Sequence, residues 1–447
     1  MRILHYFLGF PPYRTGGLTK FAFDLMNQQI LDKHNVMALW PGEMKLFTKT
    51  SCIKKRKSIN SIENYELINP LPISLDEGIQ NFDAYTKPCN PQIFSNFFLS
   101  TKPDVIHIHT LMGLPKEFVD MACQLSIRTI FTSHDYFGIC PKVTLYRYGQ
   151  LCDDDQQCKN CIQCNCSALS MKTITVMQSP LYRTLKNTRI VKQLRRKHRA
   201  DFFSEEQLPD MPPIDIDYAA NKYQELRNYY LNIFKKIDLI HFNSTLTEKI
   251  YKRYFIPKNS KVISITHKDI SDNRTKNKWH PNDKLRITYL SPAKPFKGFT
   301  ILQRALDELW EEGYHNFQLN IYSPVANPSE YMHITSEGFQ TSELSRIMSE
   351  TDVMVAPSIW YETFGFTVLE ALSYGVPVIV SNHIGAKDII NNGGIIIEVK
   401  NVKQLKQTIQ TLNVEQIRLL KNNIINNVNI KLWSTFVEEI YYLYVSR

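Results

Sequence analysis

The residues from Ala356 to Val380 (APSIWYETFGFTVLEALSYGVPVIV) combine groups that suit the binding of a phosphorylated polyol. The pattern predicts a strand that ends near Pro357, a loop that carries Glu362, and a helix that begins near Gly365 and carries Glu370. A carboxylate accepts hydrogen bonds from two hydroxyls at once. The N-terminus of a helix presents unpaired N–H groups and the positive end of the helix dipole, which suit a diphosphate. The segment therefore predicts hydroxyl binding by the carboxylates and phosphate binding by the backbone amides.

The same segment resembles the donor-site signature of family-4 glycosyltransferases of the GT-B fold. Glu362 and Glu370 surround Thr-Phe-Gly-Phe, and Glu-Ala-Leu-x-x-Gly-x-Pro-Val follows. Two glutamates at this spacing are commonplace by themselves, so the resemblance rests on the whole segment. It implies that Glu362 contacts the donor sugar, that Glu370 contacts ribose hydroxyls, and that amides near Gly365 hold the diphosphate. The donor-binding residues expected here are Glu362, Phe364, Gly365, Phe366, Thr367 and Glu370.

A second match covers Tyr289 to Gly298 (YLSPAKPFKG), which resembles the strand and loop where the family neutralises the departing diphosphate with an arginine and a lysine. Lys297 falls on the lysine position. Ser291 and Pro292 stand at the usual glycine and arginine positions, so the arginine is missing. Lys294 is the nearest substitute, and an ordinary exposed lysine is the alternative interpretation of Lys297.

Residues 131–141 (FTSHDYFGICP) resemble the family's acceptor-side histidine segment. The resemblance implies that His134 hydrogen-bonds the donor sugar or positions the acceptor hydroxyl; a histidine that only caps the strand end is the alternative. His109 is a weaker candidate of the same kind. Gly16 and Gly17 match the family's first glycine loop, whose amides approach the donor phosphates or the acceptor, although a simple turn before a helix has the same pattern. The expected catalytic residues are His134, Lys297 and Glu362.

The elements that must position these residues alternate between strands and helices. Such alternation predicts parallel sheets with helices on both faces. In the first half we expect strands at 2–8, 35–40, 104–109, 128–133, 238–243 and 262–266 and helices at 18–29 and 115–125. In the second half we expect strands at 286–291, 318–322, 353–357 and 377–381 and helices at 300–310, 342–349 and 366–374.

The resemblance implies a GT-B architecture, in which two Rossmann-like, doubly wound α/β domains face each other across a cleft. Residues 1–270 would form the acceptor-binding domain, with a cysteine-containing insertion at about 141–232. The polar stretch 269–283 has the composition of an interdomain linker. Residues 284–415 would bind the nucleotide sugar, and helices in 416–447 would cross back to the N-terminal domain.

Five of the nine cysteines crowd into the insertion between Cys152 and Cys166. The Cys-x2-Cys spacing suits a tetrahedral structural zinc, with free thiols as the alternative; a disulfide cluster fits a reducing cytoplasm less well. Asp153 to Asp155 resemble the DxD motif of the other glycosyltransferase fold but do not follow a strand. The candidate zinc ligands are Cys152, Cys158, Cys161 and Cys164, with Cys140 as an alternative to Cys152.

The net charge of +10 suits nucleic acid, an anionic membrane surface or phosphorylated substrates. No apolar run reaches the roughly 18 residues that span a bilayer. We therefore expect a cytoplasmic protein that contacts the inner face of the plasma membrane through a basic helix. The alternative interpretation of this helix is an ordinary face in contact with solvent. The basic residues are Arg183, Lys186, Arg189, Lys192, Arg195, Arg196, Lys197 and Arg199, and the apolar ones are Leu181, Leu185, Val191 and Leu194.

The resemblance implies a retaining glycosyltransferase of the hexosyltransferase type, which moves a sugar from a nucleotide diphosphate to a glycan or a polyprenyl-linked acceptor. Catalysis would need no metal or other cofactor, and nucleic acid is not an expected partner. Polysaccharide biosynthesis, such as that of a capsule, is the expected setting. The alternatives are a GT-B nucleotide-sugar epimerase and a zinc-knuckle nucleic-acid-binding or scaffold protein. The second of these does not explain the Glu362 and Glu370 segment.

Overall fold

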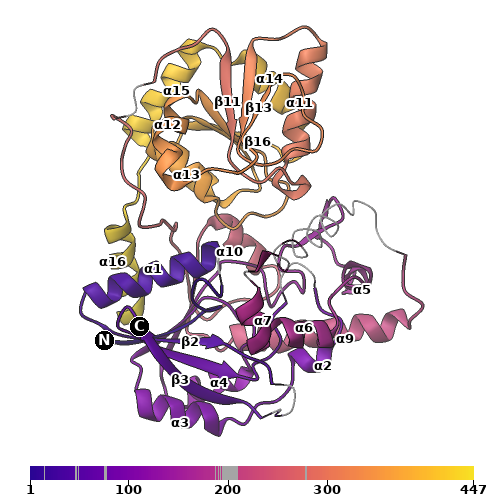
Figure 1. The fold of residues 1–447 in the computed structure, drawn as a ribbon, viewed down its shortest axis with the longest axis vertical. Coiled ribbons are helices and arrows are strands. Elements are labelled where there is room, and N and C mark those ends of the chain that lie inside the picture. Colours follow the sequence, from indigo (N-terminus) through magenta and orange to yellow (C-terminus); the bar gives the residue numbers. More distant parts are fainter. Residues whose placement is uncertain are drawn as a thin grey trace. The chain divides into compact units, whose positions relative to one another are not determined.

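The chain divides into two units, each built around its own sheet (Figure 1). The computed structural model describes residues 1–14, 16–45, 48, 50–74, 78–186, 188–189, 191, 193, 210–276 and 279–446. The first unit comprises Met1–Asn243, Glu248–Ile263 and Val437–Arg447, and the second comprises Ser244–Thr247 and Ser264–Phe436. Helix α16 (Trp433–Val445) begins in the second unit, and its end returns to the first. Among the described residues, none of the helices combines the length and the hydrophobicity that a bilayer span requires.

An eight-stranded sheet forms the core of the first unit, in the order β10-β9-β6-β5-β1-β2-β4-β3. All neighbouring strands are parallel except the β3–β4 pair, which is antiparallel. Its central strands are almost entirely buried because helices cover both faces. The strands are β1 (Arg2–Tyr6), β2 (Asn35–Pro41), β3 (Cys52–Ile59), β4 (Ile62–Ile68), β5 (Val105–Ile108), β6 (Arg128–Thr132), β9 (Leu239–Phe242) and β10 (Ser260–Val262).

The helices of this half are α1 (Gly17–Leu31), α2 (Phe82–Tyr85), α3 (Gln92–Thr101), α4 (Lys116–Gln124), α9 (Ile216–Phe234) and α10 (Thr245–Tyr251). Between β6 and α9 lie the small hairpin β7 (Tyr146–Arg147) and β8 (Gln150–Leu151) and the helices α5 (Lys159–Cys164), α6 (Met171–Met177) and α7 (Pro180–Leu185). The expected insertion at 141–232 included most of α9. Helix α9 instead completes the crossover from β6 to β9, because Tyr223, Leu226, Tyr230 and Phe234 bury one of its faces.

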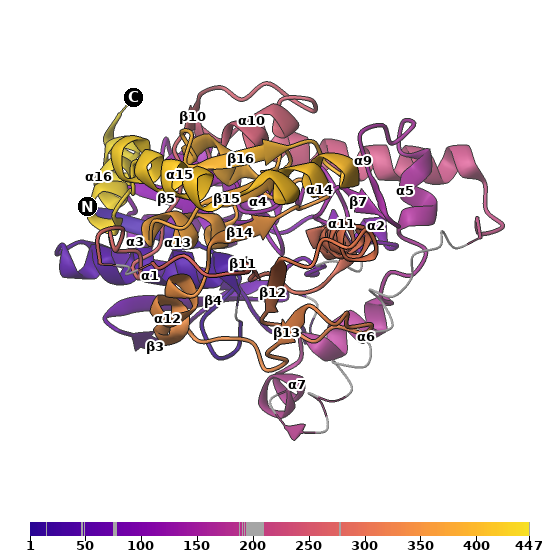
Figure 2. The same ribbon diagram turned by 90° about the horizontal axis from the view of Figure 1, so that it is seen from above.

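The second unit contains a six-stranded sheet in the order β13-β12-β11-β14-β15-β16, in which every pair is parallel. Its strands are β11 (Leu285–Tyr289), β12 (Phe317–Ile321), β13 (Met332–Ile334), β14 (Val353–Ala356), β15 (Val378–Ser381) and β16 (Gly394–Ile397). Its helices are η1 (Pro295–Lys297), α11 (Phe299–Glu311), η2 (Thr341–Glu343), α12 (Leu344–Ser349), α13 (Phe366–Ser373), η3 (Gly385–Ile389), α14 (Val402–Thr411) and α15 (Val414–Asn427). Figure 2 shows α14 beside α11, with which it makes extensive contact.

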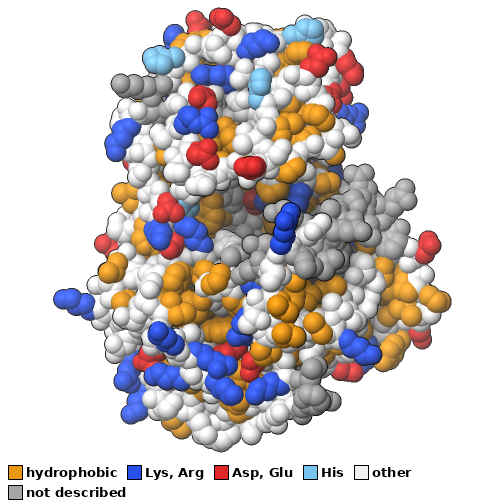
Figure 3. Space-filling view, viewed as in Figure 1, with side chains coloured by type: hydrophobic (Ala, Val, Ile, Leu, Met, Phe, Trp, Pro, Cys, Tyr) orange, Lys and Arg blue, Asp and Glu red, His pale blue; other side chains and the backbone are white. Residues whose placement is uncertain are grey.

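Strand β3 forms one edge of the first sheet and exposes a basic run, Lys54 to Lys57. Lysine and arginine side chains gather where β3 lies in the lower part of the view (Figure 3). Charged side chains on an edge strand block pairing with another chain, so this run protects the edge. The sequence patterns had not indicated β3 or β4.

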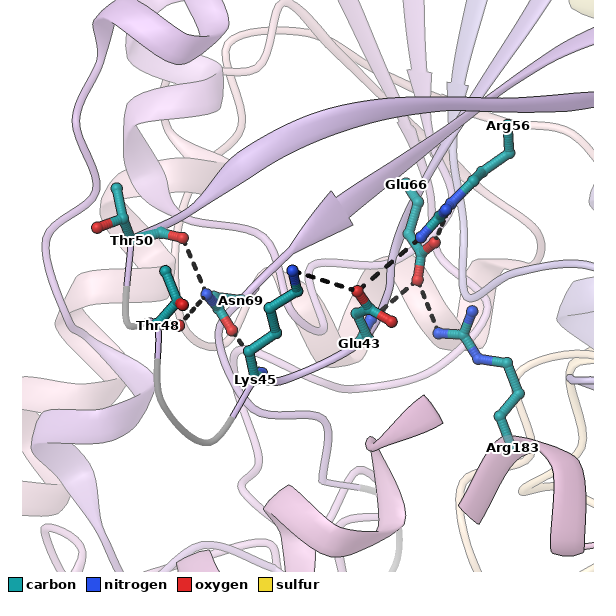
Figure 4. A network of polar contacts seen from close by, with 8 residues as sticks. All are labelled: Glu43, Lys45, Thr48, Thr50, Arg56, Glu66, Asn69 and Arg183. Atoms are coloured by element: carbon teal, nitrogen blue, oxygen red, sulfur yellow. Dashed lines mark hydrogen bonds and ion pairs between the residues drawn. The ribbon is translucent and has the colours of Figure 1, made fainter. Parts of the chain in front are cut away.

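A buried carboxylate, Glu66 of β4, ties the edge hairpin to helix α7 (Figure 4). Its two oxygens lie 2.6 Å from Arg56 Nε and 2.7 Å from Arg183 Nη2, and one of them also accepts a hydrogen bond from the amide of Glu43. Lys186 is buried as well, and its ammonium donates to the carbonyl of Tyr13. Arg183 and Lys186 therefore face the protein, which contradicts the expected solvent-facing basic helix at these two positions. Lys192, Leu194, Arg195, Arg196, Lys197 and Arg199 lie outside the described residues.

Candidate functional site

Two of the expected catalytic residues form an ion pair in the second unit. Lys297 Nζ lies 2.6 Å from Glu362 Oε1, and the exposed fractions of the two side chains are 16% and 15%. Lys297 ends the short helix η1, and Glu362 lies in the loop between β14 and α13. Because β11 and β14 are parallel neighbours, the loops that follow them meet at one edge of the sheet.

The two loops are joined by backbone contacts as well as by the ion pair. The carbonyl of Phe296 accepts hydrogen bonds from the amides of Ile359 and Trp360, at 2.9 and 3.2 Å. Gly298 has φ +79°, and a Cβ at this position would lie 1.9 Å from the carbonyl oxygen of Pro357. Only glycine allows this close approach. The Lys297 loop is therefore held against the Glu362 loop by a contact that tolerates no side chain.

The amino end of helix α13 lies directly after Glu362. Gly365 is its N-cap, with φ +101°, and no side-chain cap is found among the described residues. The preceding loop is fixed to the one after β15, because the amide of Glu362 donates to the carbonyl of His383 and its carbonyl accepts from the amide of Gly385, both at 2.9 Å. Phe364 is buried and anchors this loop. The first amides of α13, at Phe366 and Thr367, are therefore presented from a rigid turn.

Glu370 occupies the second turn of α13, as the sequence predicted. Its Oε1 lies 3.3 Å from Nε2 of His267, which also makes an edge-to-face contact with the ring of Phe366 at a centroid distance of 5.3 Å. His267 belongs to the second unit, in the segment that leads away from β10. No sequence pattern indicated His267, because no motif surrounds it.

The charge of Lys297 keeps Glu362 ionised. Burial alone would raise the pKa of Glu362, but the adjacent Lys297 ammonium and the hydroxyl of Ser358, which donates to Oε2 at 2.6 Å, outweigh it and lower the pKa. Ser358 lies two residues after β14 and was not expected from the sequence. The site thus holds a carboxylate acceptor and a cation beside a helix N-terminus.

The remaining predicted donor residues are less closely grouped. Lys294 Nζ lies 5.5 Å from the centre of the Phe296 ring, near the start of η1. Gly16 and Gly17 begin α1 in the first unit; Gly16 has φ +126°, and a Cβ on either glycine would meet nothing within 4 Å. The structure therefore groups Lys297, Glu362 and Glu370 on one unit and places the glycine pair on the other.

His134 lies in the first unit, immediately after β6. Its side chain is partly exposed and packs edge-to-face on Phe21 at a centroid distance of 4.8 Å. Its Nε2 lies 3.3 Å from Nδ1 of His109, which is completely buried. Burial lowers the pKa of His134 to about 3, so the imidazole is neutral at physiological pH.

The cysteine cluster divides in the structure. Cys158 and Cys161 lie close to Asp155, with the three ligand atoms within 4.8 Å of one another. Arg227 also reaches this group, with Nη2 2.5 Å from Asp155 Oδ2 and 3.8 Å from Cys161 Sγ. Cys152 and Cys164, the other two expected zinc ligands, are outside this three-residue group. A cation at this point competes with any metal for the same carboxylate.

The two units, each built on a doubly wound sheet that is parallel apart from the β3–β4 pair, define the GT-B fold that the sequence predicted. The chain resembles the sucrose-phosphate synthase of Thermosynechococcus elongatus (15% identity, TM-score 0.56, covering 99% of this chain and 98% of that one). It also resembles Anabaena HepE in complex with UDP (13% identity, TM-score 0.56, covering 100% of both chains). A third similar structure is WaaG, a glycosyltransferase involved in lipopolysaccharide biosynthesis (12% identity, TM-score 0.53, 100% of both chains).

Residues 271–429 match the family described as "Glycosyl transferases group 1". The match covers nearly all of the second unit, including Lys297, Glu362 and Glu370. No curated protein matches the sequence. The similar structures show the fold, and the family match covers only residues of the second unit.

Proposed function

We propose that this protein is a retaining glycosyltransferase that moves a hexosyl group from a nucleotide diphosphate to a glycan or lipid-linked acceptor. The observation that carries the proposal is the grouping of Lys297 and Glu362 at the amino end of α13, in the unit that matches a glycosyltransferase family. Glu370, farther along the same helix, adds a second carboxylate. Lys297 and the helix amides suit the diphosphate, Glu362 suits the sugar, and Glu370 suits the ribose.

In this proposal the donor diphosphate displaces Glu362 from Lys297. The ammonium and the amides of Phe366 and Thr367 then stabilise the negative charge that develops on the leaving diphosphate. Glu362 accepts hydrogen bonds from sugar hydroxyls, and Glu370 accepts them from the ribose. A phosphate oxygen of the donor deprotonates the acceptor hydroxyl on the same face, so no protein nucleophile is assigned. Catalysis uses no metal.

The first unit is proposed to bind the acceptor and to contribute His134. A growing surface polysaccharide, such as a capsule on a polyprenyl carrier, is the proposed acceptor, reached at the inner face of the plasma membrane. Arg183 and Lys186 face inward, so among the described residues the exposed Arg189 and the unpaired basic residues of β3, Lys54 and Lys57, are the ones proposed to contact an anionic membrane. A structural zinc in the cysteine insertion remains a separate proposal.

A nucleotide screen tests the donor site. Thermal unfolding would be followed with uridine, guanosine and deoxythymidine diphosphates and their sugars, and UDP is the first choice because HepE was solved with it. We expect one series to stabilise the protein by RT ln(1 + [L]/Kd), which is about 2.7 kcal/mol at 100 times Kd. Lys297→Ala and Glu370→Ala should both reduce this stabilisation. No response to any nucleotide, with tight binding of nucleic acid instead, would favour the scaffold alternative.

The proposed ribose contact of Glu370 has its own test. If a carboxylate accepts from both ribose hydroxyls, the 2′-deoxy form of the preferred ribonucleotide should bind about tenfold more weakly, because a hydrogen bond to a charged group contributes about 1.5–3 kcal/mol. Glu370→Ala should abolish this preference, whereas Glu398→Ala, a glutamate of the same unit on the segment after β16, should keep it. Equal discrimination in both variants would remove Glu370 from the proposed site.

Transfer and epimerisation are distinguished by the products. An epimerase converts the donor without an acceptor and returns a nucleotide sugar, whereas a transferase releases free nucleoside diphosphate. Slow hydrolysis of the donor in the absence of an acceptor should therefore yield the diphosphate with the anomeric configuration of the sugar retained. Accumulation of a second nucleotide sugar would establish the epimerase alternative.

A further inference from the structure

Five histidines of the first unit lie along neighbouring strands of the sheet. His5 lies on β1, His107 on β5 and His241 on β9, and His109 and His134 follow β5 and β6. Strands β9, β6, β5 and β1 are consecutive in the sheet, so these side chains are brought together by the topology. Four of them are 0% exposed, and His134 alone is partly exposed. Buried polar groups require partners, and these histidines find theirs in one another and in the side chains and backbone around them.

One half of the resulting hydrogen-bonded chain runs from β9 to the C-terminal helix. His241 Nε2 lies 2.8 Å from the carbonyl oxygen of Ile263, and its Nδ1 lies 3.0 Å from Thr132 Oγ1. Thr132 Oγ1 lies 2.7 Å from His107 Nε2, and His107 Nδ1 lies 2.8 Å from the hydroxyl of Tyr444. All these residues belong to the first unit.

The other half runs from Tyr444 to His134. Gln29 Nε2 donates to the Tyr444 oxygen at 3.0 Å, and Gln29 Oε1 lies 2.7 Å from His5 Nε2. His5 Nδ1 lies 2.9 Å from His109 Nε2, and His109 Nδ1 lies 3.3 Å from His134 Nε2. The chain is therefore continuous from the Ile263 carbonyl to the partly exposed imidazole of His134.

The Ile263 carbonyl at one end determines which atom donates and which accepts in each hydrogen bond of the first half. A carbonyl only accepts, so neutral His241 carries its proton on Nε2, and its Nδ1 accepts from the Thr132 hydroxyl. The Thr132 oxygen then accepts from Nε2 of His107, whose Nδ1 accepts from the Tyr444 hydroxyl. Since that hydroxyl donates its single proton to His107, the Tyr444 oxygen is left to accept from the amide of Gln29.

The same logic continues to His134. With its amino group turned to Tyr444, Gln29 presents its oxygen to His5, which must carry its proton on Nε2. His5 Nδ1 then accepts from Nε2 of His109, and His109 Nδ1 accepts from Nε2 of His134. Each step requires a neutral ring, because an imidazolium donates from both nitrogens.

Burial of the hydrogen-bonded histidines keeps their rings neutral. Burial lowers the pKa of His5 to about 4 and of His134 to about 3. Burial also lowers the pKa of His107 and His109 far below the ordinary value, with smaller contributions from the neighbouring histidines. Burial raises the pKa of Tyr444, so its hydroxyl keeps its proton.

A contact outside the hydrogen-bonded chain of histidines also holds Tyr444 in place. It lies near the end of α16, where Arg128 of β6 donates to the carbonyl of Leu443 from Nε at 3.1 Å and from Nη2 at 2.9 Å. This bidentate contact fixes the last turn of the helix against the sheet. The C-terminal helix therefore delivers one hydroxyl to a defined point between Gln29 and His107.

We propose that Tyr444 and Gln29 act as positioning residues that hold His134 as its Nε2–H tautomer, with Nδ1 as an acceptor for a hydroxyl proton of the sugar or acceptor substrate. This inference rests on the proposed function for the identity of the substrate. A neutral ring that accepts at Nδ1 suits a hydroxyl, which donates, and disfavours a phosphate oxygen, which only accepts. It therefore assigns His134 to a sugar hydroxyl rather than to the diphosphate.

A metal site at the same residues is the competing interpretation. The ligand nitrogens of His5, His107 and His109 lie within 4.8 Å of one another, a spacing that also suits a metal ion. However, both nitrogens of each ring already have hydrogen-bond partners in the chain described above. A metal would break several of these bonds at once, so the hydrogen-bonded chain is the better explanation of the cluster.

The tautomer is measured directly by two-bond ¹H–¹⁵N correlation spectra of the protein labelled with ¹⁵N-histidine, at pH 7 and without substrate. The signals of His134 are assigned from their loss in His134→Asn. We expect His134 to be neutral with its proton on Nε2, and the four buried histidines to share this tautomer. A proton on Nδ1 of His134 in the unmodified protein would overturn the proposal, and this result requires no variant of the chain.

Tyr444→Phe tests the positioning role. Without the hydroxyl, the Gln29 amide is free to turn over and reverse the direction from His5 to His134, so the two ¹⁵N shifts of His134 should move toward each other. Tyr441→Phe is the matched control, because Tyr441 lies on the same helix and its hydroxyl bonds Asp32 Oδ2 at 2.6 Å, outside the chain. Unchanged His134 shifts in folded Tyr444→Phe would refute the positioning role.

The spectra also separate this inference from the proposed function. They report the tautomer whether or not the protein binds a nucleotide sugar. If the protein shows the expected tautomer but binds none of the nucleotides, the hydrogen-bonded chain of histidines stands. The assignment of His134 to a sugar hydroxyl is then removed. In an active enzyme, Tyr444→Phe should lower kcat/KM with a shift in the tautomer, whereas Tyr441→Phe should change neither.

Discussion

Lys297 and Glu362, which lie 65 residues apart in the chain, pair their charges at 2.6 Å beside the first turn of α13. The pair holds a cation and an acceptor in place before any ligand arrives, since each side chain fixes the position of the other. A diphosphate would replace the carboxylate as the partner of Lys297 and release Glu362 toward hydroxyls. Preorganised charges of this kind need little rearrangement during a reaction.

Lys297→Ala should remove the cation and leave Glu362 buried without its partner. We expect kcat to fall about 100-fold or more, as on loss of a single oxyanion donor. We also expect the free energy of unfolding to fall by up to about 3 kcal/mol, because an uncompensated buried charge is costly. Transfer rates and urea unfolding would measure both effects. Lys294→Ala is the control: it removes the other candidate cation of the same loop, and an equal loss of activity would show that the pairing does not single out Lys297.

Gly298→Ala should be far more damaging than alanine at another glycine of the same conformation. Gly298 and Gly313 have φ +79° and +85°, so both substitutions strain the backbone by about 1–2 kcal/mol. At Gly298 the new Cβ would also lie 1.9 Å from the Pro357 carbonyl oxygen, whereas at Gly313 it would meet nothing within 4 Å. The overlap should add about 1–3 kcal/mol. Equal midpoints of urea unfolding for the two variants would contradict the close approach of the loops.

Glu66 should make the first unit sensitive to acid. Burial would raise its pKa, but the hydrogen bonds and charges of Arg183 and Arg56 outweigh burial and lower it. A lowered pKa in the folded state means that the stabilisation is fully present above the unfolded pKa of about 4.3 and is lost as the pH falls through the folded value. Glu66→Gln should therefore cost about 3 kcal/mol at pH 7 and flatten the loss of stability below about pH 4.3.

The control for Glu66 lies on the same strand. Glu63 pairs with Lys55 at 2.7 Å, but its side chain is 43% exposed, so Glu63→Gln should change the free energy of unfolding by less than about 1 kcal/mol. Urea unfolding from pH 3 to pH 7 would compare the two variants. A similar pH profile for both would show that burial of the Glu66 carboxylate does not matter.

Elements with a strong local pattern were predicted well from the sequence. The helix from Phe366 to Ser373, with Gly365 before it and Glu370 on it, lies where the motif indicated, because its start depends on local residues. The edge hairpin of β3 and β4 was missed: β3 carries four successive basic residues and is mostly exposed, so it lacks the alternation that marks a half-buried strand. The short strands β13 and β16 were also missed.

Contacts between segments that are distant in the chain could not be predicted from the sequence. Nothing around His267 indicates that it reaches Glu370, and nothing around Tyr444 indicates a bond to His107, 337 residues away. The motif for His134 identified the end of the histidine chain but none of the partners that fix its proton. Such relationships arise from the order of strands in the sheet, which the spacing of residues along the chain does not specify.

The cysteine insertion is stabilised either by a bound metal ion or by an ion pair. If it binds a structural zinc, protein purified under reducing conditions should contain one zinc per chain, and Cys158→Ser and Cys161→Ser should each lose it. Zinc binding would also require Asp155 or its neighbours to part from Arg227, which lies 2.5 Å from Asp155 Oδ2. Arg227→Ala should then preserve or strengthen zinc binding, since a competing cation is removed.

The matched control for the zinc experiment is Cys123→Ser, because Cys123 lies on α4 and is not part of the insertion. Its zinc content should equal that of the unmodified protein. Metal analysis and thermal unfolding with and without a chelator would follow all four variants. If the purified protein holds no zinc and Arg227→Ala is destabilised instead, the Arg227–Asp155 ion pair, rather than a metal, stabilises the packing of α5 on α9. That outcome would leave the cysteines as free thiols and would remove zinc from the proposed composition of the enzyme.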